Sequence, residues 1–245
     1  PMKRLSIFIV GIMMAVVAMS RTFDMKQLGA DAKGIKSCTE LINRTIEKAA
    51  SEGGGTIYFP VGTYLTATIH MKSNITLYLE SGAVLRFSDK FEDYLPFVTL
   101  RWEGTVMKSL SPLIYAHSAD NVTISGRGTL DGNGLKWWLW EFDTRKVIKE
   151  NGGKLPTLDK LQQMWVDANK DLEISDYYKP SLERRMFRPP FIQFYECTNI
   201  LIENVKIINS PFWTINPAFC DNVTIHGVTT VSYTHLRAHE TPEHL

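Results

Sequence analysis

The hydrophobic pattern of the chain is a series of short β-branched runs separated by Asn, Gly and Pro. Asn199-Ile-Leu-Ile is repeated 23 residues later, from 199 to 222, by Asn222-Val-Thr-Ile, and the same phrase occurs earlier at Asn121 and Asn74. Such runs predict strands joined by turns. A fixed period in the twenties indicates a solenoid, whose coils bury their apolar faces only against neighbouring coils. We therefore predict an all-β fold, a right-handed parallel β-helix with Asn stacked at one corner.

The repeat also assigns roles to asparagines and cysteines. Asn74, Asn121 and Asn222 lie in N-glycosylation sequons, but their shared phase predicts that their side chains bond the backbone inside the solenoid corner. Cys197 and Cys220 lie one coil apart, at about the 4.8 Å strand spacing. That is within disulfide reach. Because in-register neighbours point their Cβ atoms in parallel, we expect a stack of two buried thiols.

The first third of the chain predicts one helix and several strands. Ser37 and Glu40 form a candidate capping box, followed by helical spacing from Leu41 to Ala49. This helix would cover the open N-terminal end of the solenoid. Strands are expected at 56–59, 65–71, 75–80, 83–87, 113–117 and 122–125, with an excursion from the coil at 88–111.

Residues 135–187 differ in composition from the rest of the chain. Glycine nearly disappears, charged residues increase, and the sequence becomes helical or irregular, before the repeat returns at residues 188–192. We interpret this stretch as an insertion on one coil of a single β-helix domain that covers residues 22–231. Long loops on a rigid scaffold usually build binding surface.

Both ends of the chain differ from the repeat. Residues 1–20 combine a basic start with an apolar run of about 16 residues, which is short for a membrane span and predicts a cleaved signal peptide. The protein is then expected to be secreted or periplasmic. Residues 232–245 break the alternation, and we interpret them as a non-native tail. His235 and His239 in that tail are four apart, which would suit a metal pair on a helix, but they lie in a segment interpreted as non-native, so neither a metal nor a cofactor is expected.

The charge balance narrows the choice of partners. Lys and Arg number 27 against 26 Asp and Glu, a net charge of +1. This gives no electrostatic case for nucleic acid or for an anionic membrane after signal cleavage, and any positive charge would have to be local. We expect a monomer.

Three phrases resemble one family in the family's own order. SPFWTINPAFCDNVTI, SGRGTLDGNG and GGGTIYFPVGTYLT resemble stretches of glycoside hydrolase family 28, the polygalacturonases, and the similarity runs from about residue 23 to 230. The resemblance implies inverting hydrolysis of galacturonic-acid polysaccharides such as pectin. In that family Asn-Thr-Asp, Asp-Asp, Gly-His-Gly and Arg-Ile-Lys motifs follow, and none of them occurs in this sequence. We therefore expect the N-terminal portion of such an enzyme, inactive alone and without assignable catalytic residues.

Five residues are candidates for binding the polysaccharide. Trp137 and Trp138 begin the insertion, where they either stack on sugar rings or pack the insertion against the coil. The resemblance places Trp213 near the substrate groove, although burial is an equal alternative. It also implies that Arg188 and Asn216 face this groove. Arg188 would hold a uronate carboxylate bidentately, or else pair with a carboxylate of the insertion.

Two other functions remain open. A β-helical polysaccharide lyase would need clustered carboxylates for Ca²⁺, and no Asp-rich cluster is visible. A non-catalytic glycan-binding β-helix needs only aromatic residues and a groove. Asp131 is the one carboxylate in a family-like phrase, and its Gly-Asn setting favours a turn-forming role over a catalytic one.

Overall fold

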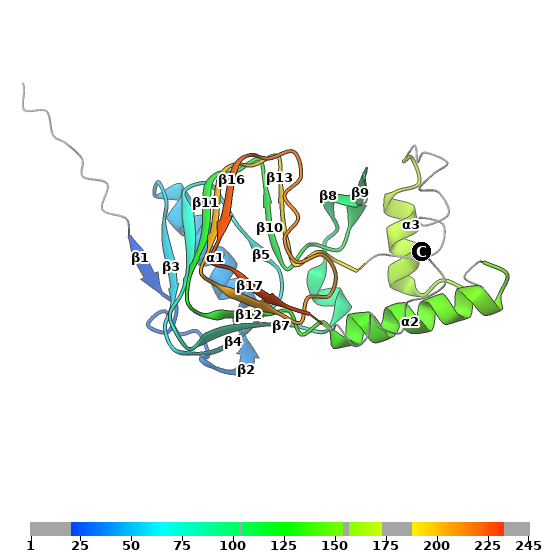
Figure 1. Cartoon of the computed structure of the whole chain (residues 1–245), viewed down its shortest axis with the longest axis horizontal. Helices are drawn as coiled ribbons and strands as arrows, with labels where there is room; N and C mark the ends of the chain where they lie inside the picture. Colours follow the sequence, from blue (N-terminus) through cyan, green and yellow to red (C-terminus); the bar gives the residue numbers. More distant parts are fainter. Residues whose placement is uncertain (1–20, 103, 154–156, 173–187, 233–245) are drawn as a thin grey trace, which may run out of the picture.

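The computed structural model describes residues 21–232 except 103, 154–156 and 173–187. The predicted signal peptide, and the predicted tail from residue 233 onward, lie outside the described residues. Most described residues form a solenoid, from which a hairpin and the helices α2 and α3 project (Figure 1).

The solenoid consists of three parallel sheets and is the right-handed parallel β-helix that the repeat predicts. Sheet A contains, in spatial order, β1 (Thr22–Asp24), β3 (Gly55–Phe59), β6 (Ile75–Leu79), β11 (Asp120–Gly126), β14 (Thr198–Glu203) and β16 (Asp221–His226). Sheet B contains β2 (Lys33–Ser37), β4 (Gly62–Thr66), β7 (Ala83–Phe87), β12 (Thr129–Asp131), β15 (Lys206–Ile208) and β17 (Thr229–Val231). Sheet C contains β5 (Ile69–His70), β10 (Ile114–His117) and β13 (Ile192–Tyr195). The coils that begin at β3, β6 and β11 visit the sheets in the order A, B, C.

The predicted register of the last two coils is confirmed. In sheet A, Thr198 pairs with Asp221 and Ile200 with Val223, so residues 23 apart lie side by side. Cys197 and Cys220 are consequently stacked, and both are free thiols. Each donates to backbone carbonyls, Cys197 Sγ to Tyr195 O at 3.3 Å and Cys220 Sγ to Phe194 O at 3.1 Å. Burial raises the pKa of the Cys197 thiol, which keeps it protonated.

The asparagine column forms, but the predicted bonding of its side chains is wrong. All four asparagines (74, 121, 199 and 222) are exposed, and each has a positive φ between 53° and 62°. Their amides bond one another rather than the backbone: Asn121 Nδ2 donates to Asn74 Oδ1 at 3.0 Å, and Asn222 Nδ2 to Asn199 Oδ1 at 2.6 Å. The left-handed conformation, which Asn tolerates, turns the chain into sheet A and leaves the side chain outside the corner.

Asp120 interrupts this column and accepts two hydrogen bonds. Its Oδ1 lies 2.6 Å from Thr198 Oγ1 and 2.7 Å from Asn199 Nδ2. These bonds hold the pKa of the Asp120 carboxyl below its ordinary value of 3.8. The folded state therefore favours the carboxylate more than the unfolded state does.

Replacing Asp120 by alanine is expected to lower the melting temperature at neutral pH but not in strong acid. The stabilisation from the two bonds is complete above pH 3.8 and is lost as the pH falls below that value, through the lower folded-state pKa. Thermal melts from about pH 7 to about pH 2 test this, with Asp143→Ala on an exposed helix face as the control. A melting-temperature difference that persists unchanged at the acid end would contradict the assignment.

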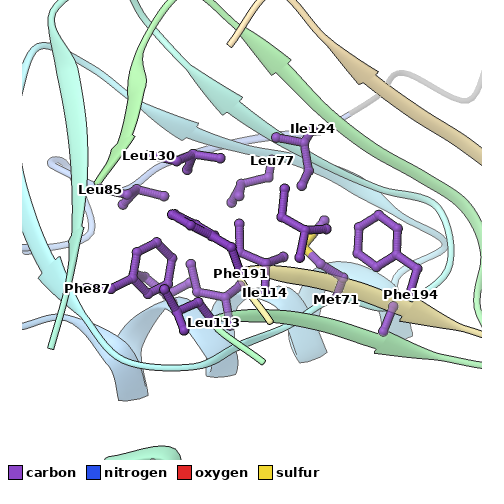
Figure 2. Close-up of a cluster of buried hydrophobic side chains, with 14 of the residues drawn as sticks. Met71, Leu77, Leu85, Phe87, Leu113, Ile114, Ile124, Leu130, Phe191 and Phe194 are labelled. Carbon is purple, nitrogen blue, oxygen red and sulfur yellow. The ribbon is translucent and has the colours of Figure 1, made fainter. Parts of the chain in front are cut away.

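The core is a continuous column of inward-facing side chains enclosed by the three sheets. Figure 2 shows residues from sheets B and C converging around Phe191, with Leu77 and Ile124 of sheet A alongside. The Phe191 ring meets Phe87 edge-on with centroids 5.2 Å apart. A Cβ on Gly132 would lie 2.7 Å from Phe191 Cε2, so this aromatic layer requires a glycine there.

Helix α1 (Thr39–Ser51) follows the predicted helical spacing, with Ile42, Thr45, Ile46 and Ala49 buried. The predicted capping box is wrong, because the N-cap position is Cys38 and no side chain caps the helix. Ser37 is instead the last residue of β2, paired with Leu65. The Thr39 hydroxyl accepts from Ala67 N at 2.7 Å, which ties the helix start to the neighbouring coil and divides the predicted strand 65–71 into β4 and β5.

Two excursions leave the solenoid at the same place in consecutive coils, between sheets B and C. The first contains the 3₁₀ helix η1 (Phe91–Tyr94) and the antiparallel hairpin of β8 (Val98–Trp102) and β9 (Thr105–Ser109). The second contains α2 (Leu135–Glu150) and α3 (Lys160–Ala168), in the stretch predicted to be helical or irregular.

Within the described residues, no helix combines the length and apolar character needed to cross a bilayer.

One asparagine bonds the insertion to the hairpin. Asn169, at the end of α3, accepts from Lys108 N at 2.8 Å and donates to Lys108 O at 2.7 Å. This pair of bonds connects the insertion to strand β9 of the hairpin.

Candidate functional site

The corner between sheets B and C brings most of the predicted binding residues together. Trp137 and Trp138 lie in the first turn of α2, Arg188 lies just before β13, and Trp213 lies in the equivalent connection of the next coil. The stacking of coils therefore brings residues up to 76 positions apart in the sequence, Trp137 and Trp213, to the same corner. This corner is the candidate site.

Arg188 is buried in a cage of aromatic rings and polar atoms, with 6 % of its surface exposed. Its guanidinium carbon lies 3.9 Å from the centre of the Trp138 ring, and its Nη1 donates to Pro211 O at 2.8 Å. Its Nε lies 3.8 Å from Glu141 Oε2, on a carboxylate that is itself only 2 % exposed. The ion pair with the insertion that the sequence left as an alternative is thus present, and the role in binding a substrate carboxylate stays a prediction.

Trp138 links the insertion to the coil that carries Trp213. Its indole Nε1 donates to Ser210 O at 2.9 Å, and the residue is 5 % exposed. Trp137 is fully buried and stacks on Phe91 with ring centroids 3.9 Å apart. The contacts of both residues are those of the packing alternative, and their part in sugar binding remains untested.

Trp213 is partly exposed and belongs to a stack of three aromatic rings. Its ring lies 4.5 Å from Phe212 and 6.3 Å from Trp102, measured between centroids. Trp102 comes from strand β8, so this stack joins the hairpin to the coil. The sequence did not assign Trp102 or Phe212 to the site, because neither residue has a repeat phase.

Asn216 continues the outer face of sheet C into the next coil. A bridge pairs Ile215 with Ile192, which puts Asn216 beside Gln193. The Gln193 amide holds the hairpin, donating to Arg101 O at 2.9 Å. Within the described part of the chain, Asn216 Nδ2 is buried without a hydrogen-bond partner. A buried donor of this kind is normally satisfied by a water or a ligand.

Two titratable groups on the same face, Tyr115 and His70, are shifted toward their neutral forms. Tyr115 donates its hydroxyl to Thr99 O at 2.5 Å, and burial raises its pKa to about 12. Burial also lowers the pKa of His70, whose ring meets Tyr115 edge-on at 6.0 Å between centroids. Tyr115 and His70 therefore act on this face as neutral hydrogen-bonding groups.

Asp131 has the contacts of a turn residue. Its Oδ1 accepts from Asn133 N at 3.0 Å and from Asn209 Nδ2 at 2.8 Å, and its Oδ2 lies 3.8 Å from Arg86 Nε. These bonds favour the turn-forming role. Among the described residues, no group of three or more His, Cys, Asp or Glu side chains is arranged to hold a metal ion.

Comparisons with known proteins agree with this architecture. A Vitis vinifera protein named "Probable polygalacturonase" is 27 % identical over 192 residues, which is 76 % of this chain and 31 % of that protein. An exopolygalacturonase structure from Thermotoga maritima is 38 % identical with a TM-score of 0.69, over 86 % of this chain and 47 % of that one. A family 28 exopolygalacturonase from Yersinia enterocolitica, at 22 % identity and a TM-score of 0.63, supports the fold.

The fold is a right-handed parallel β-helix, and the resemblance to family 28 polygalacturonases is confirmed. The chain belongs to the family described as rhamnogalacturonase A/epimerase, pectate lyase-like, whose sequence profile matches residues 22–151. It spans less than half the length of the relatives just described.

Proposed function

We propose that this chain is the substrate-binding portion of a secreted or periplasmic glycoside hydrolase that acts on galacturonic-acid polysaccharides. The observation that carries the proposal is the 38 % identity to an exopolygalacturonase over 86 % of the chain. We also propose that residues 22–231 form a single β-helix domain with its insertion at 135–187, and that residues 1–20 are a cleaved leader.

The polysaccharide would lie across the outer face of sheet C, beside the corner with sheet B. Trp213 supplies a partly exposed aromatic ring, and Asn216 supplies a buried amide donor without a partner among the described residues. Arg188 contacts Pro211 and Phe212. In this proposal Arg188 and Trp138 would support the sugar-binding surface indirectly, by holding these two residues in place. In this proposal Trp137 supports the insertion from within the core.

The reaction of the whole enzyme would be inverting hydrolysis. One carboxylic acid protonates the glycosidic oxygen while a carboxylate activates water from the other side, with about 6.5–9.5 Å between them. The four family motifs that supply these groups do not occur in this sequence. Because each general acid or base typically contributes about 10²–10⁴-fold, we propose that this polypeptide binds without cleaving.

Isothermal titration of the full chain with an oligogalacturonate, and with a neutral galacto-oligosaccharide of equal length, tests the proposal. We expect binding of the acidic oligomer, and about fivefold weaker binding by Asn216→Ala because a donor to the sugar is lost. Asn151→Ala, at the end of α2, is the matched control. Absence of oligogalacturonate binding by the unchanged chain would refute the proposal.

A reducing-end assay with the same oligogalacturonate separates the remaining alternatives. We expect no release of reducing ends above a heat-killed control. This chain alone would then behave as a glycan-binding β-helix. Release that disappears in Asp131→Ala would make that aspartate catalytic. Release of unsaturated products, detected by ultraviolet absorbance, would instead identify a lyase.

A further inference from the structure

A second corner, between sheets C and A, carries a column of residues in an unusual backbone conformation. Strands β10 and β13 pair His117 with Tyr195, and a bridge pairs Tyr195 with Ala218. The residues that follow are therefore equivalent in three coils. They are Ser118, Glu196 and Phe219, with φ of 51°, 53° and 55°.

Phe219 differs from the other members of this column. A bulky side chain in the left-handed region is an outlier, because its Cβ crowds the backbone. The ring is 61 % exposed, so burial offsets little of this strain. Strain of this kind is characteristic of functional positions.

The neighbours of the Phe219 ring come from two different elements. The guanidinium carbon of Arg101, from hairpin strand β8, lies 5.5 Å from the centre of the ring. Tyr195 meets the ring edge-on with centroids 5.6 Å apart, and His117 meets Tyr195 in the same way at 5.1 Å. An exposed aromatic ring thus stands beside an exposed cation on a rigid sheet.

The charges around the ring are unequally paired. Glu196 has His117 as a partner, with Oε2 and Nε2 3.4 Å apart. Across the described ranges, Arg101 has no carboxylate within ion-pair distance, although two backbone bonds to Gln193 fix its position. Its guanidinium therefore offers its N–H donors to an external anion.

We propose that Arg101 and Phe219 form a further subsite for an acidic sugar residue of the same polysaccharide. The ring of Phe219 would stack on the apolar C–H face of the sugar, while Arg101 would bind its carboxylate. This proposal rests on the proposed function and deepens it. Phe219 lies three residues beyond Asn216, at the end of the segment that pairs with β13 through Ile215 and Ala218, so a polysaccharide that crosses sheet C meets both corners.

Titration of Phe219→Ala and Arg101→Gln with the oligogalacturonate and the neutral oligomer tests this subsite. Each substitution is expected to weaken oligogalacturonate binding about tenfold. Phe219→Tyr should retain the affinity, because it keeps the ring. Val61→Ala, at 60 % exposure on another part of the surface, and Arg44→Gln on α1 are the matched controls.

The outcomes distinguish this subsite from the proposed function. If the unchanged chain binds oligogalacturonate and both variants bind it equally well, the subsite is refuted and the proposed function stands. If both variants lose affinity for acidic and neutral oligomers alike, the assignment to an acidic sugar is wrong. If the unchanged chain binds no oligogalacturonate, both proposals fall together.

Discussion

Replacing Glu141 by alanine is expected to lower the free energy of unfolding by about 3–5 kcal/mol. The carboxylate is 2 % exposed, and its Oε2 lies 3.8 Å from Nε of Arg188, which is also buried. Its Oε1 accepts from Arg145 Nε at 2.7 Å. Removing the carboxylate leaves the Arg188 charge desolvated without this anion, and that cost exceeds the value of the pair itself.

Urea denaturation of Glu141→Ala and of Glu150→Ala, an exposed carboxylate on the same helix, measures this effect. The double variant Glu141→Leu with Arg188→Met should recover most of the loss, because it removes both charges of this buried pair. A loss in Glu141→Ala no larger than in Glu150→Ala would show that the pair does not hold the insertion to the coil.

Replacing Phe191 by alanine is expected to cost a similar amount, about 3–5 kcal/mol, through the cavity it leaves. Phe191 is fully buried between Phe87 and the backbone at Gly132, and coils on either side restrict collapse of the site. Phe191→Leu keeps more of the volume and should cost less.

Phe219→Ala is the natural control for the core substitution, because it removes the same side chain from the surface. The expected change there is within about 0.5 kcal/mol. Equal destabilisation by the two substitutions in urea melts would contradict the position of Phe191 in the core.

The register of the last two coils could be predicted from sequence because their matching asparagine phrases are separated by one 23-residue period. Asn199 and Asn222 share a phase, and a parallel coil has only one way to align them. The direction of their side chains was not predictable in the same way. It depends on a left-handed backbone at the corner, which exposes a side chain that a repeat alone would assign to the interior.

The prediction of the helix cap was wrong, and the predicted site residues stayed untested, for a related reason: both depend on contacts between distant parts of the chain. Ser37 satisfies the local rule for a cap, but its pairing with Leu65 in sheet B overrides that rule. One partner of Arg188, Glu141, lies 47 residues earlier on a helix without a repeat phase. Sequence could name Arg188 as a charged residue at the corner, whereas its partner required the folded insertion.

Because Asn169 and Lys108 bond each other, the hairpin and the insertion should be transferable between proteins only as a pair. The hairpin and the insertion belong to different coils, yet the side-chain amide of Asn169 bonds both the backbone N–H and the backbone carbonyl of Lys108. Grafting the insertion alone onto a related scaffold would separate this amide from both partners. Loop transplantation between such scaffolds should therefore move residues 88–111 and 135–187 together, and the lengths of the two loops are expected to change in concert.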